Sequence, residues 1–367
     1  MFSRSIAILF TLLCFTPFAS LGQSSKPFVI GASSQHAALL IHSPRMENLR
    51  GTQPQGVEIN IQLQTTGSSE WHQDYNYPRL GVSLLWFDYN NPSLGHSFAI
   101  SPYVSKPFHR SEHHELHLRV GTGLAYFTNR YDAERNPENE TISNRLNATM
   151  QARLDYDYKI RHNLSLNAGL GFHHYSNGAR RKPNLGLNLP TLSVGVNYYT
   201  LPLFTTTQVE REPFRAHTFI DISGSIGVKR LSPEHLEKYS ARSFSIAFGK
   251  QLNRKSNLIT GIEGFHDQSL YTVRNQDPTL DPESSLPDVR RVGGMIGHEL
   301  VMGKLILETH LGLYLYRPYK VETFYYERLG VKYLITNNIF TAIDLKAHGG
   351  SANVVEFRLG SRLPFTK

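Results

Sequence analysis

Apolar and polar residues alternate along most of this chain, in short segments that are separated by turn-like stretches. Between residues 163 and 176, for example, the even positions carry mainly leucine, alanine and phenylalanine, and the odd ones mostly asparagine, serine and glycine. Successive residues of a β-strand point to opposite faces, so this pattern predicts strands with one apolar and one polar face. We expect strands near residues 28–42, 56–66, 78–89, 95–105, 113–128, 146–160, 163–177, 189–200, 214–228, 240–252, 256–266, 289–301, 304–316, 321–334, 339–348 and 352–363.

The spacing of these segments, about 20 residues for each strand with its connection, is typical of transmembrane β-barrels. Short and long connections also alternate, as expected when tight periplasmic turns face longer outer loops. The short joins are residues 160–163, 252–256, 302–303 and 336–338. The long joins are residues 129–145, 178–188, 229–239 and 267–288. The predicted fold is therefore all-β, a transmembrane antiparallel outer-membrane β-barrel of about 14–16 strands; a soluble β-sandwich is the alternative fold.

The N-terminus indicates export. Arg4 precedes an apolar run from Ile6 to Ala19, followed by small residues, which predicts a signal peptide over residues 1–22. The only cysteine, Cys14, lies in that segment, so we expect no disulfides in the mature chain. We expect residues 23–367 to form a single outer-membrane barrel domain in a Gram-negative bacterium. The modest net charge of +8, without a basic helix, excludes nucleic acid as an expected partner.

His174 and Ser176 stand at the end of an alternating strand and share its apolar face. A histidine and a serine two residues apart on one face can serve as base and nucleophile. A second polar set, His113, Glu115 and His117, also shares a strand face and could hold a metal, but a solvated periplasmic rim is the simpler interpretation.

The segment from His174 to Asn188 resembles the lipid A 3-O-deacylase family, the PagL-like outer-membrane barrels and related acyloxyacyl hydrolases. The matching residues are His174, Ser176, Asn177, Gly178, Pro183, Asn184 and Gly186. The resemblance implies a serine hydrolase site on the outer wall of the barrel. It gives Ser176 the role of nucleophile, His174 that of general base and Asn184 that of oxyanion donor, with Asn177 as a second candidate donor.

One position departs from the family pattern. Where characterised members carry a carboxylate twelve residues after the serine, this chain has Asn188. Strand parity places Asn188 on the outward face of the adjoining strand, beside His174. An asparagine carbonyl can accept the imidazole hydrogen and fix its tautomer, but it supplies no full charge. An acid from another strand is the alternative.

These observations predict an outer-membrane serine esterase that removes an ester-linked acyl chain from lipid A, the anchor of lipopolysaccharide in the outer leaflet. The scheme requires no metal or cofactor. Arg180, Arg181 and Lys182 could bind the phosphates of the substrate, although a solvated loop tip also explains them. The outer-membrane insertion machinery is an expected partner, and a homodimer remains open. The alternatives are a non-enzymatic porin or structural barrel, whose sixteen strands could enclose an aqueous lumen, and a phospholipase that uses the same dyad.

Overall fold

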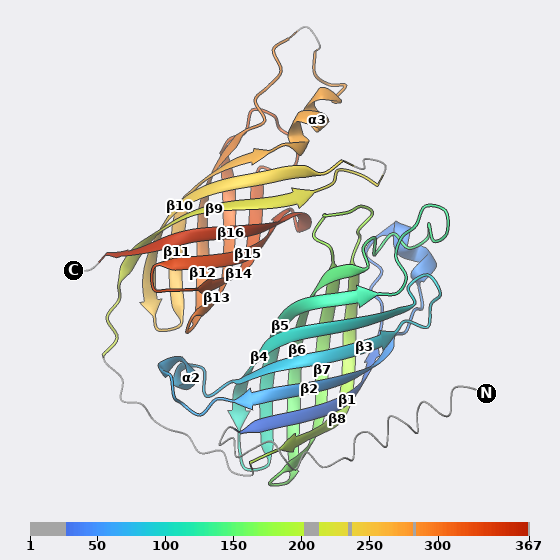
Figure 1. Ribbon diagram of the computed structural model, residues 1–367, viewed down its shortest axis with the longest axis vertical. Helices are drawn as coiled ribbons and strands as arrows, with labels where there is room; N and C mark the ends of the chain where they lie inside the picture. The colour runs from blue at the N-terminus through green and yellow to red at the C-terminus, as the bar shows by residue number, and fades with distance from the viewer. Residues whose placement is uncertain (1–26, 202–212, 234–236, 282–283, 366–367) are drawn as a thin grey trace.

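The computed structural model describes residues 27–201, 213–233, 237–281 and 284–365 (Figure 1). The predicted signal peptide lies outside these residues. Among the described residues there are sixteen strands, as the alternation predicts. They are β1 Phe28–Ala37, β2 Gln55–Gln64, β3 Arg79–Asp88, β4 His96–Arg110, β5 His114–Phe127, β6 Leu146–Arg161, β7 Leu164–Ser176, β8 Leu187–Tyr199, β9 Thr218–Lys229, β10 Tyr239–Asn253, β11 Ser256–Asp267, β12 Arg291–Met302, β13 Leu305–Tyr316, β14 Tyr325–Leu334, β15 Ile339–His348 and β16 Ser351–Phe365. Three short helices accompany them: η1 Pro44–Leu49, α2 Glu70–Asp74 and α3 Ser269–Asn275. No helix in the described ranges combines the length and apolarity needed to cross a membrane.

The strands close into two separate antiparallel barrels of eight strands each. β8 pairs with β1, with Val29 opposite Tyr199, and β16 pairs with β9, with Phe357 opposite Ile226. The prediction of one barrel domain over residues 23–367 is therefore wrong, although the strand count and fold class are correct. The alternation within a strand is the same whichever neighbour it pairs with, so the pattern does not reveal where a sheet closes.

The connections show which strand ends lie together at each end of a barrel. β2–β3, β4–β5 and β6–β7 join at one end of the first barrel, where β8 also ends. The β7–β8 connection and the long segment between β5 and β6 lie at the other end. In the second barrel the tight β10–β11, β12–β13 and β14–β15 turns fall at the end where β9 begins. With short turns facing the periplasm, β7 ends at the outer surface.

Apolar side chains cover the outer faces of both barrels, and polar side chains fill their lumens. On β7, Leu166 and Leu170 are exposed outward, whereas Ser165, Asn167 and His173 are buried inside. An eight-stranded barrel is just wide enough for side chains to fill its interior. The first lumen holds ion pairs such as that of Arg119 with Glu58 (2.7 Å).

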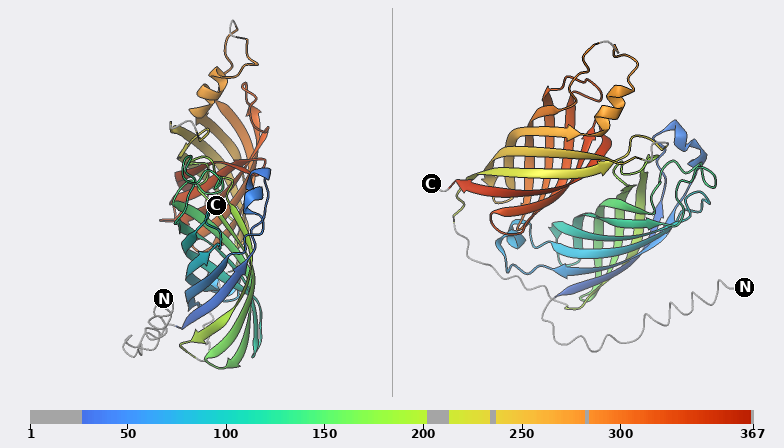
Figure 2. Two further views of the ribbon diagram at one scale, coloured as in Figure 1. Left: turned by 90° about the vertical axis from the view of Figure 1, so that its right-hand side faces the viewer. Right: turned by 45° about the horizontal axis from the view of Figure 1, so that its top comes forward.

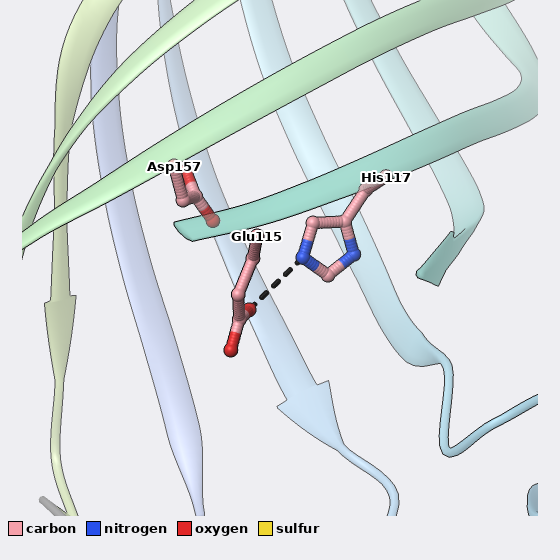
Figure 3. Close-up of side chains that lie close together, drawn as sticks. All are labelled: Glu115, His117 and Asp157. Atoms are coloured by element: carbon pink, nitrogen blue, oxygen red, sulfur yellow. Dashed lines mark hydrogen bonds and ion pairs between the residues drawn. The ribbon is translucent and has the colours of Figure 1, made fainter. Parts of the chain in front are cut away.

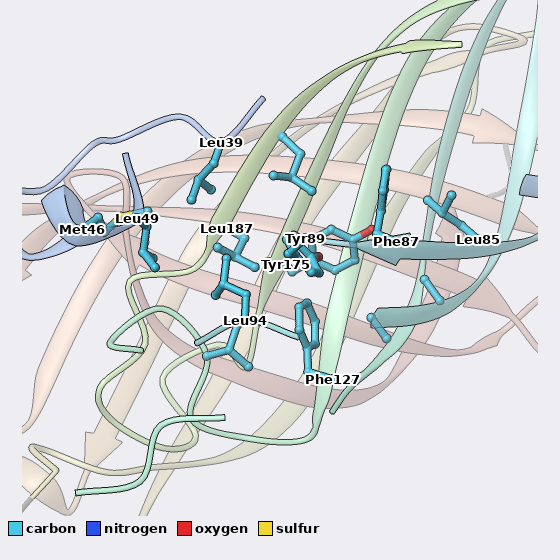
Figure 4. Close-up of a cluster of buried hydrophobic side chains, with 14 residues drawn as sticks. Leu39, Met46, Leu49, Leu85, Phe87, Tyr89, Leu94, Phe127, Tyr175 and Leu187 are labelled. Carbon is cyan, nitrogen blue, oxygen red and sulfur yellow. The ribbon is translucent and has the colours of Figure 1, made fainter. Parts of the chain in front are cut away.

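An apolar cluster fills the outer end of the first barrel (Figure 4). Phe87, Tyr89, Phe127 and Tyr175 are its fully buried aromatic members. Leu49 and Met46 of η1 pack onto it from the β1–β2 connection. A cavity of about 10 Å³ lies among the polar residues of the lumen, about the smallest space that holds one water. The porin alternative assumed a sixteen-stranded lumen, and this filled eight-stranded barrel does not provide it.

The second barrel is filled by a denser set of ion pairs. Lys332 bonds Asp221 (3.0 Å) and also contacts Glu299, and Arg362 bonds the same two carboxylates. Arg328 pairs with Glu356 and lies 3.3 Å from Glu263. Buried charges are tolerated when they are paired and hydrogen-bonded in this way.

The two barrels lie side by side and contact each other at both ends (Figures 1 and 2). At the periplasmic end the Tyr75 hydroxyl donates to the Val301 carbonyl (2.8 Å), and Arg254 pairs with Glu70 of α2 (2.6 Å). At the outer end the backbone N–H of Arg230 donates to the Ala179 carbonyl (3.2 Å). Periplasmic segments thus meet periplasmic segments and outer segments meet outer segments, so both barrels have the same orientation.

Candidate active site

The residues singled out in the sequence meet at the outer end of β7 and β8. His174 and Ser176 both project from the outward face of β7, where each is half-buried. Asn188 of β8 stands directly opposite His174 in the strand register. The carbonyl oxygen of its side chain lies 2.7 Å from His174 Nδ1. This contact holds the proton on Nδ1 and leaves Nε2 free to accept another.

Two donors converge on the hydroxyl of Ser176. The Asn184 side-chain amide donates to Ser176 Oγ (2.9 Å), and the backbone N–H of Gly178 donates to the same atom (3.2 Å). Among the hydrogen bonds of the described residues there is none between Ser176 and His174. The Ser176 hydroxyl and the His174 imidazole nevertheless lie on the same face of β7, two residues apart. A hydrogen bond between them can form when substrate binds, because catalytic hydrogen bonds are often long without substrate. Gly178 was not foreseen as a donor, because only the loop conformation aims its N–H at the serine.

Asn177, the second candidate oxyanion donor, has a different task. Its side-chain nitrogen donates to Ser143 Oγ and to the Arg181 carbonyl, both at 3.0 Å. Its side-chain oxygen accepts from the Arg181 N–H (3.2 Å). With these bonds made, the amide is buried and turned away from Ser176, so the structure corrects that expectation. Asn177 instead fixes the loop, and its backbone N–H donates to the side-chain oxygen Oδ1 of Asn184 (3.1 Å).

A further histidine, which the sequence did not single out, lies behind Asn188. His42, in the β1–β2 connection, has Nδ1 3.3 Å from the Asn188 side-chain nitrogen. Its Nε2 lies 3.1 Å from the carbonyl oxygen of Leu185. His42 is 132 positions before His174, at the end of the first predicted strand (residues 28–42), and no local pattern pairs it with Asn188, so only the tertiary structure shows this contact.

The loop between β7 and β8 fits closely around these groups. Gly186 has φ +78°, and a Cβ there would lie 3.1 Å from Cε1 of His174. A side chain at this position would press on the imidazole, which explains why glycine is required.

The predicted phosphate-binding residues lie on the same loop. Arg180 is exposed, whereas Arg181 and Lys182 are half-buried. Burial lowers the pKa of Lys182, and the nearby charges of Lys229 and Arg45 act in the same direction. Burial likewise lowers the pKa of Arg181, beside Arg130 and Arg230, with only Asp132 opposing. A cluster of positive charges of this kind favours the binding of an anion.

The second polar set forms a different arrangement from the one expected. Glu115 and His117 point into the lumen beside Asp157 (Figure 3), whereas His113 lies exposed in the β4–β5 turn. The guanidinium of Arg79 bonds both Glu115 and Asp157, the latter at 2.9 Å. Lys159 also lies 2.9 Å from Glu115. Glu115, His117 and Asp157 are buried, and the negative charges of the two carboxylates are paired with Arg79 and Lys159. The solvated-rim interpretation is therefore wrong for them, and an ion-pair network takes its place.

Two family models match the chain, one for each barrel. Residues 55–197 match the model described as "Lipid A 3-O-deacylase (PagL)". Residues 218–366 match the model described as "Acyloxyacyl hydrolase, C-terminal domain". The first barrel therefore matches the lipid A 3-O-deacylase family over residues 55–197. Consistent with this family and with the barrel fold, the protein is located in the outer membrane of a Gram-negative bacterium.

Solved outer-membrane barrels are also similar, at low identity. Neisserial surface protein A is 15% identical, with 47% of this chain and 96% of that chain covered and a TM-score of 0.34. The P. putida toluene transporter TodX is 11% identical, with 96% and 89% covered and a TM-score of 0.17. No curated protein matches the chain at a significant level.

Proposed function

We propose that this protein is a serine esterase that removes an ester-linked acyl chain from lipid A in the outer leaflet. One observation carries the proposal: on the lipid-facing wall, Ser176 receives two hydrogen-bond donors, and His174 on the same face has its tautomer set by Asn188. Polar groups facing hydrocarbon are costly, so a constellation of this kind needs a use. The match of the first barrel to the lipid A 3-O-deacylase model supports lipid A as the substrate.

In the proposed first step His174 Nε2 takes the hydroxyl proton of Ser176 while Oγ attacks the acyl carbonyl carbon. The carbonyl oxygen becomes an oxyanion, and the donors at Asn184 and Gly178 lie close enough to Oγ to turn to it. The intermediate then expels the sugar oxygen, which takes the proton from His174. Water, deprotonated by His174, hydrolyses the acyl-serine ester, releases the fatty acid and regenerates the hydroxyl.

Four further residues support the proposed reaction. Asn188 keeps His174 in the tautomer with a free Nε2. Arg181 and Lys182, with exposed Arg180, lie on the loop that follows Ser176, and charge-assisted hydrogen bonds suit them to bind lipid phosphates. The scheme uses only side chains and backbone of this chain, and no metal or cofactor takes part in it.

The test is mass spectrometry of lipid A from cells that express the wild type or Ser176→Ala. The wild type should remove one acyl chain and the variant none. Ser165→Ala is the matched control, because Ser165 lies on the same strand but points into the lumen. Intact lipid A in all three, with the barrels folded at the cell surface, would refute the proposal. Fatty acid released from phospholipid vesicles would then identify a phospholipase.

A further inference from the structure

Among the described residues, the strand of the second barrel that corresponds to β7 carries no copy of the constellation described above. That strand is β15, but its outward positions at the outer end are Leu345 and Ala347, and two glycines follow. The role of the second barrel must therefore come from something other than an active site of its own. The outer contact between the barrels suggests such a role, because the second barrel meets the first at the loop that follows Ser176.

Two contacts tie the second barrel to this loop. The backbone N–H of Arg230, which follows β9, donates to the Ala179 carbonyl (3.2 Å). Gly178 faces the side chain of Val355 on β16, and any Cβ at Gly178 would collide with it. The N–H of Gly178 is one of the two donors to Ser176. The second barrel thus abuts the residue whose backbone N–H is a candidate oxyanion donor.

The same contact brings cations of both barrels together. The Arg230 backbone meets the loop two residues before Arg181, and Lys182 follows on that loop. Among the described residues, none of these three side chains forms an ion pair with a carboxylate. Arg230 Nε is also buried without a hydrogen-bond partner. Leaving a buried cationic donor unpaired is costly, and an anionic ligand removes that cost.

We propose that Arg181, Lys182 and Arg230 form one anion site shared by the two barrels, which binds a phosphate group of the lipid substrate. The proposal rests on the esterase function and assigns to the second barrel a part in substrate recognition. Phosphate is the chemical class that fits, because guanidinium groups bind its oxygens in pairs and lysine adds a point charge. The position beside Ser176, at the outer end of β7, is where a lipid phosphate would lie when an acyl chain reaches the serine.

The experiment compares Arg230→Ala with the wild type on lipid A that carries its phosphates and on the dephosphorylated lipid. We expect KM for the phosphorylated lipid to rise about tenfold, the effect of losing a charge-assisted hydrogen bond. Activity on the dephosphorylated lipid should not change. Arg290→Ala is the control, because it removes an exposed outer-loop arginine of the same barrel that is paired with Asp288.

Arg230→Lys keeps the charge and the backbone bond, so it should retain most of the preference for phosphorylated lipid even if Arg230→Ala folds poorly. Equal losses on both lipids, or no loss on either, would overturn the shared anion site. If the wild type released no acyl chain at all, the esterase proposal would fail separately. The anion site would then be tested by itself through binding. The affinities of the Ser176→Ala protein for phosphorylated and for dephosphorylated lipid A would be compared with those of the Ser176→Ala, Arg230→Ala protein.

An independent observation concerns His42. An asparagine side chain can orient His174 only if its oxygen, rather than its nitrogen, faces the imidazole. The Asn188 side-chain nitrogen lies 3.3 Å from His42 Nδ1. When Nδ1 accepts a hydrogen bond from this nitrogen, the amide is held with its oxygen toward His174. His42 Nε2 lies 3.1 Å from the Leu185 carbonyl, which takes the single ring hydrogen of a neutral imidazole. With that hydrogen on Nε2, Nδ1 carries a lone pair that can accept from the Asn188 nitrogen, and its 3.3 Å separation from the Leu40 carbonyl is then not a hydrogen bond.

We infer that His42 is a positioning residue, which holds the Asn188 amide so that its oxygen faces His174. A carboxylate at position 188 would need no such help, because both of its oxygens are acceptors. His42→Ala should therefore lower kcat about tenfold in the wild-type background, with KM unchanged, the effect of one lost hydrogen bond between neutral groups. In the Asn188→Asp background the same substitution should have little effect on kcat.

His36→Ala is the matched control, because His36 is an exposed histidine on β1 whose partner is Ser34. Resistance of the folded barrel to denaturation in detergent, measured for every variant, separates misfolding from a loss of positioning. His42→Gln, which can offer an acceptor oxygen, should recover part of the lost kcat. An equal loss in both backgrounds, or no loss in either, would show that His42 does not act through Asn188.

Discussion

Replacing Asn188 by aspartate is the most informative single change at this site. It would place a carboxylate where the amide oxygen now lies, 2.7 Å from His174 Nδ1. When His174 carries the serine proton, the two groups become an ion pair about 4 Å apart. At an effective dielectric constant of 20, that pair attracts by about 4 kcal/mol. Desolvation of the carboxylate and the hydrogen bond that asparagine already makes reduce the gain.

A net gain of about 1.5–3 kcal/mol, typical of a hydrogen bond to a charged group, remains. Because the imidazolium forms only as the reaction proceeds, this gain lowers the activation barrier and raises kcat by about 10- to 100-fold. The loss of about four orders of magnitude on an Asp→Asn change in a serine protease triad came mainly from the wrong tautomer. Asn188 already fixes the correct tautomer, so the expected gain is much smaller than that loss.

The assay measures kcat and KM for release of the acyl chain from lipid A in mixed micelles, with equal amounts of folded wild type and variant. Asn188→Leu, which has no acceptor, provides the opposite control and should lower kcat by at least about 100-fold. The reasoning is refuted if Asn188→Asp leaves kcat unchanged or lowers it. The same holds if Asn188→Leu is as active as the wild type, because His174 would then be oriented by another group.

The remaining predictions concern the oxyanion donor, the loop and the lumens. Asn184→Ala should lower kcat about 100-fold with little change in KM, because the lost donor acts on charge that develops in the transition state; a change confined to KM in steady-state kinetics would contradict this. Gly186→Ala should reduce activity without unfolding the barrel, since the added Cβ lies 3.1 Å from His174 at a positive φ, and full activity would rule out that contact. Arg79→Met should destabilise the first barrel by about 3–5 kcal/mol in urea unfolding, because Glu115 and Asp157 stay buried without their shared cation; unchanged stability would show that they are protonated or hydrated instead. Planar bilayers containing the protein should show no steady single-channel conductance, and a stable open channel would show that the lumens are not filled as described.

The sequence by itself determined the sixteen strands, which face of each is apolar, and which end carries the long loops. These properties follow from local rules, since side chains alternate across a strand whatever its neighbours are. The same parity places His174 and Ser176 on the lipid-facing wall, with Asn188 on the outward face of the next strand. The resemblance to the deacylase family supplied their roles, which remain proposals.

What only the tertiary structure decided depends on contacts between distant segments. β8 returns to β1 rather than pairing with β9, and alternation along a strand carries no information about that choice. The Asn177 side-chain amide bonds Ser143 and not Ser176, because the loop folds back on the β5–β6 connection. His42 reaches Asn188 from the β1–β2 connection, and Arg230 reaches the loop from the second barrel. Each of these contacts is fixed by barrel closure and loop packing, which bring together residues that no local pattern links.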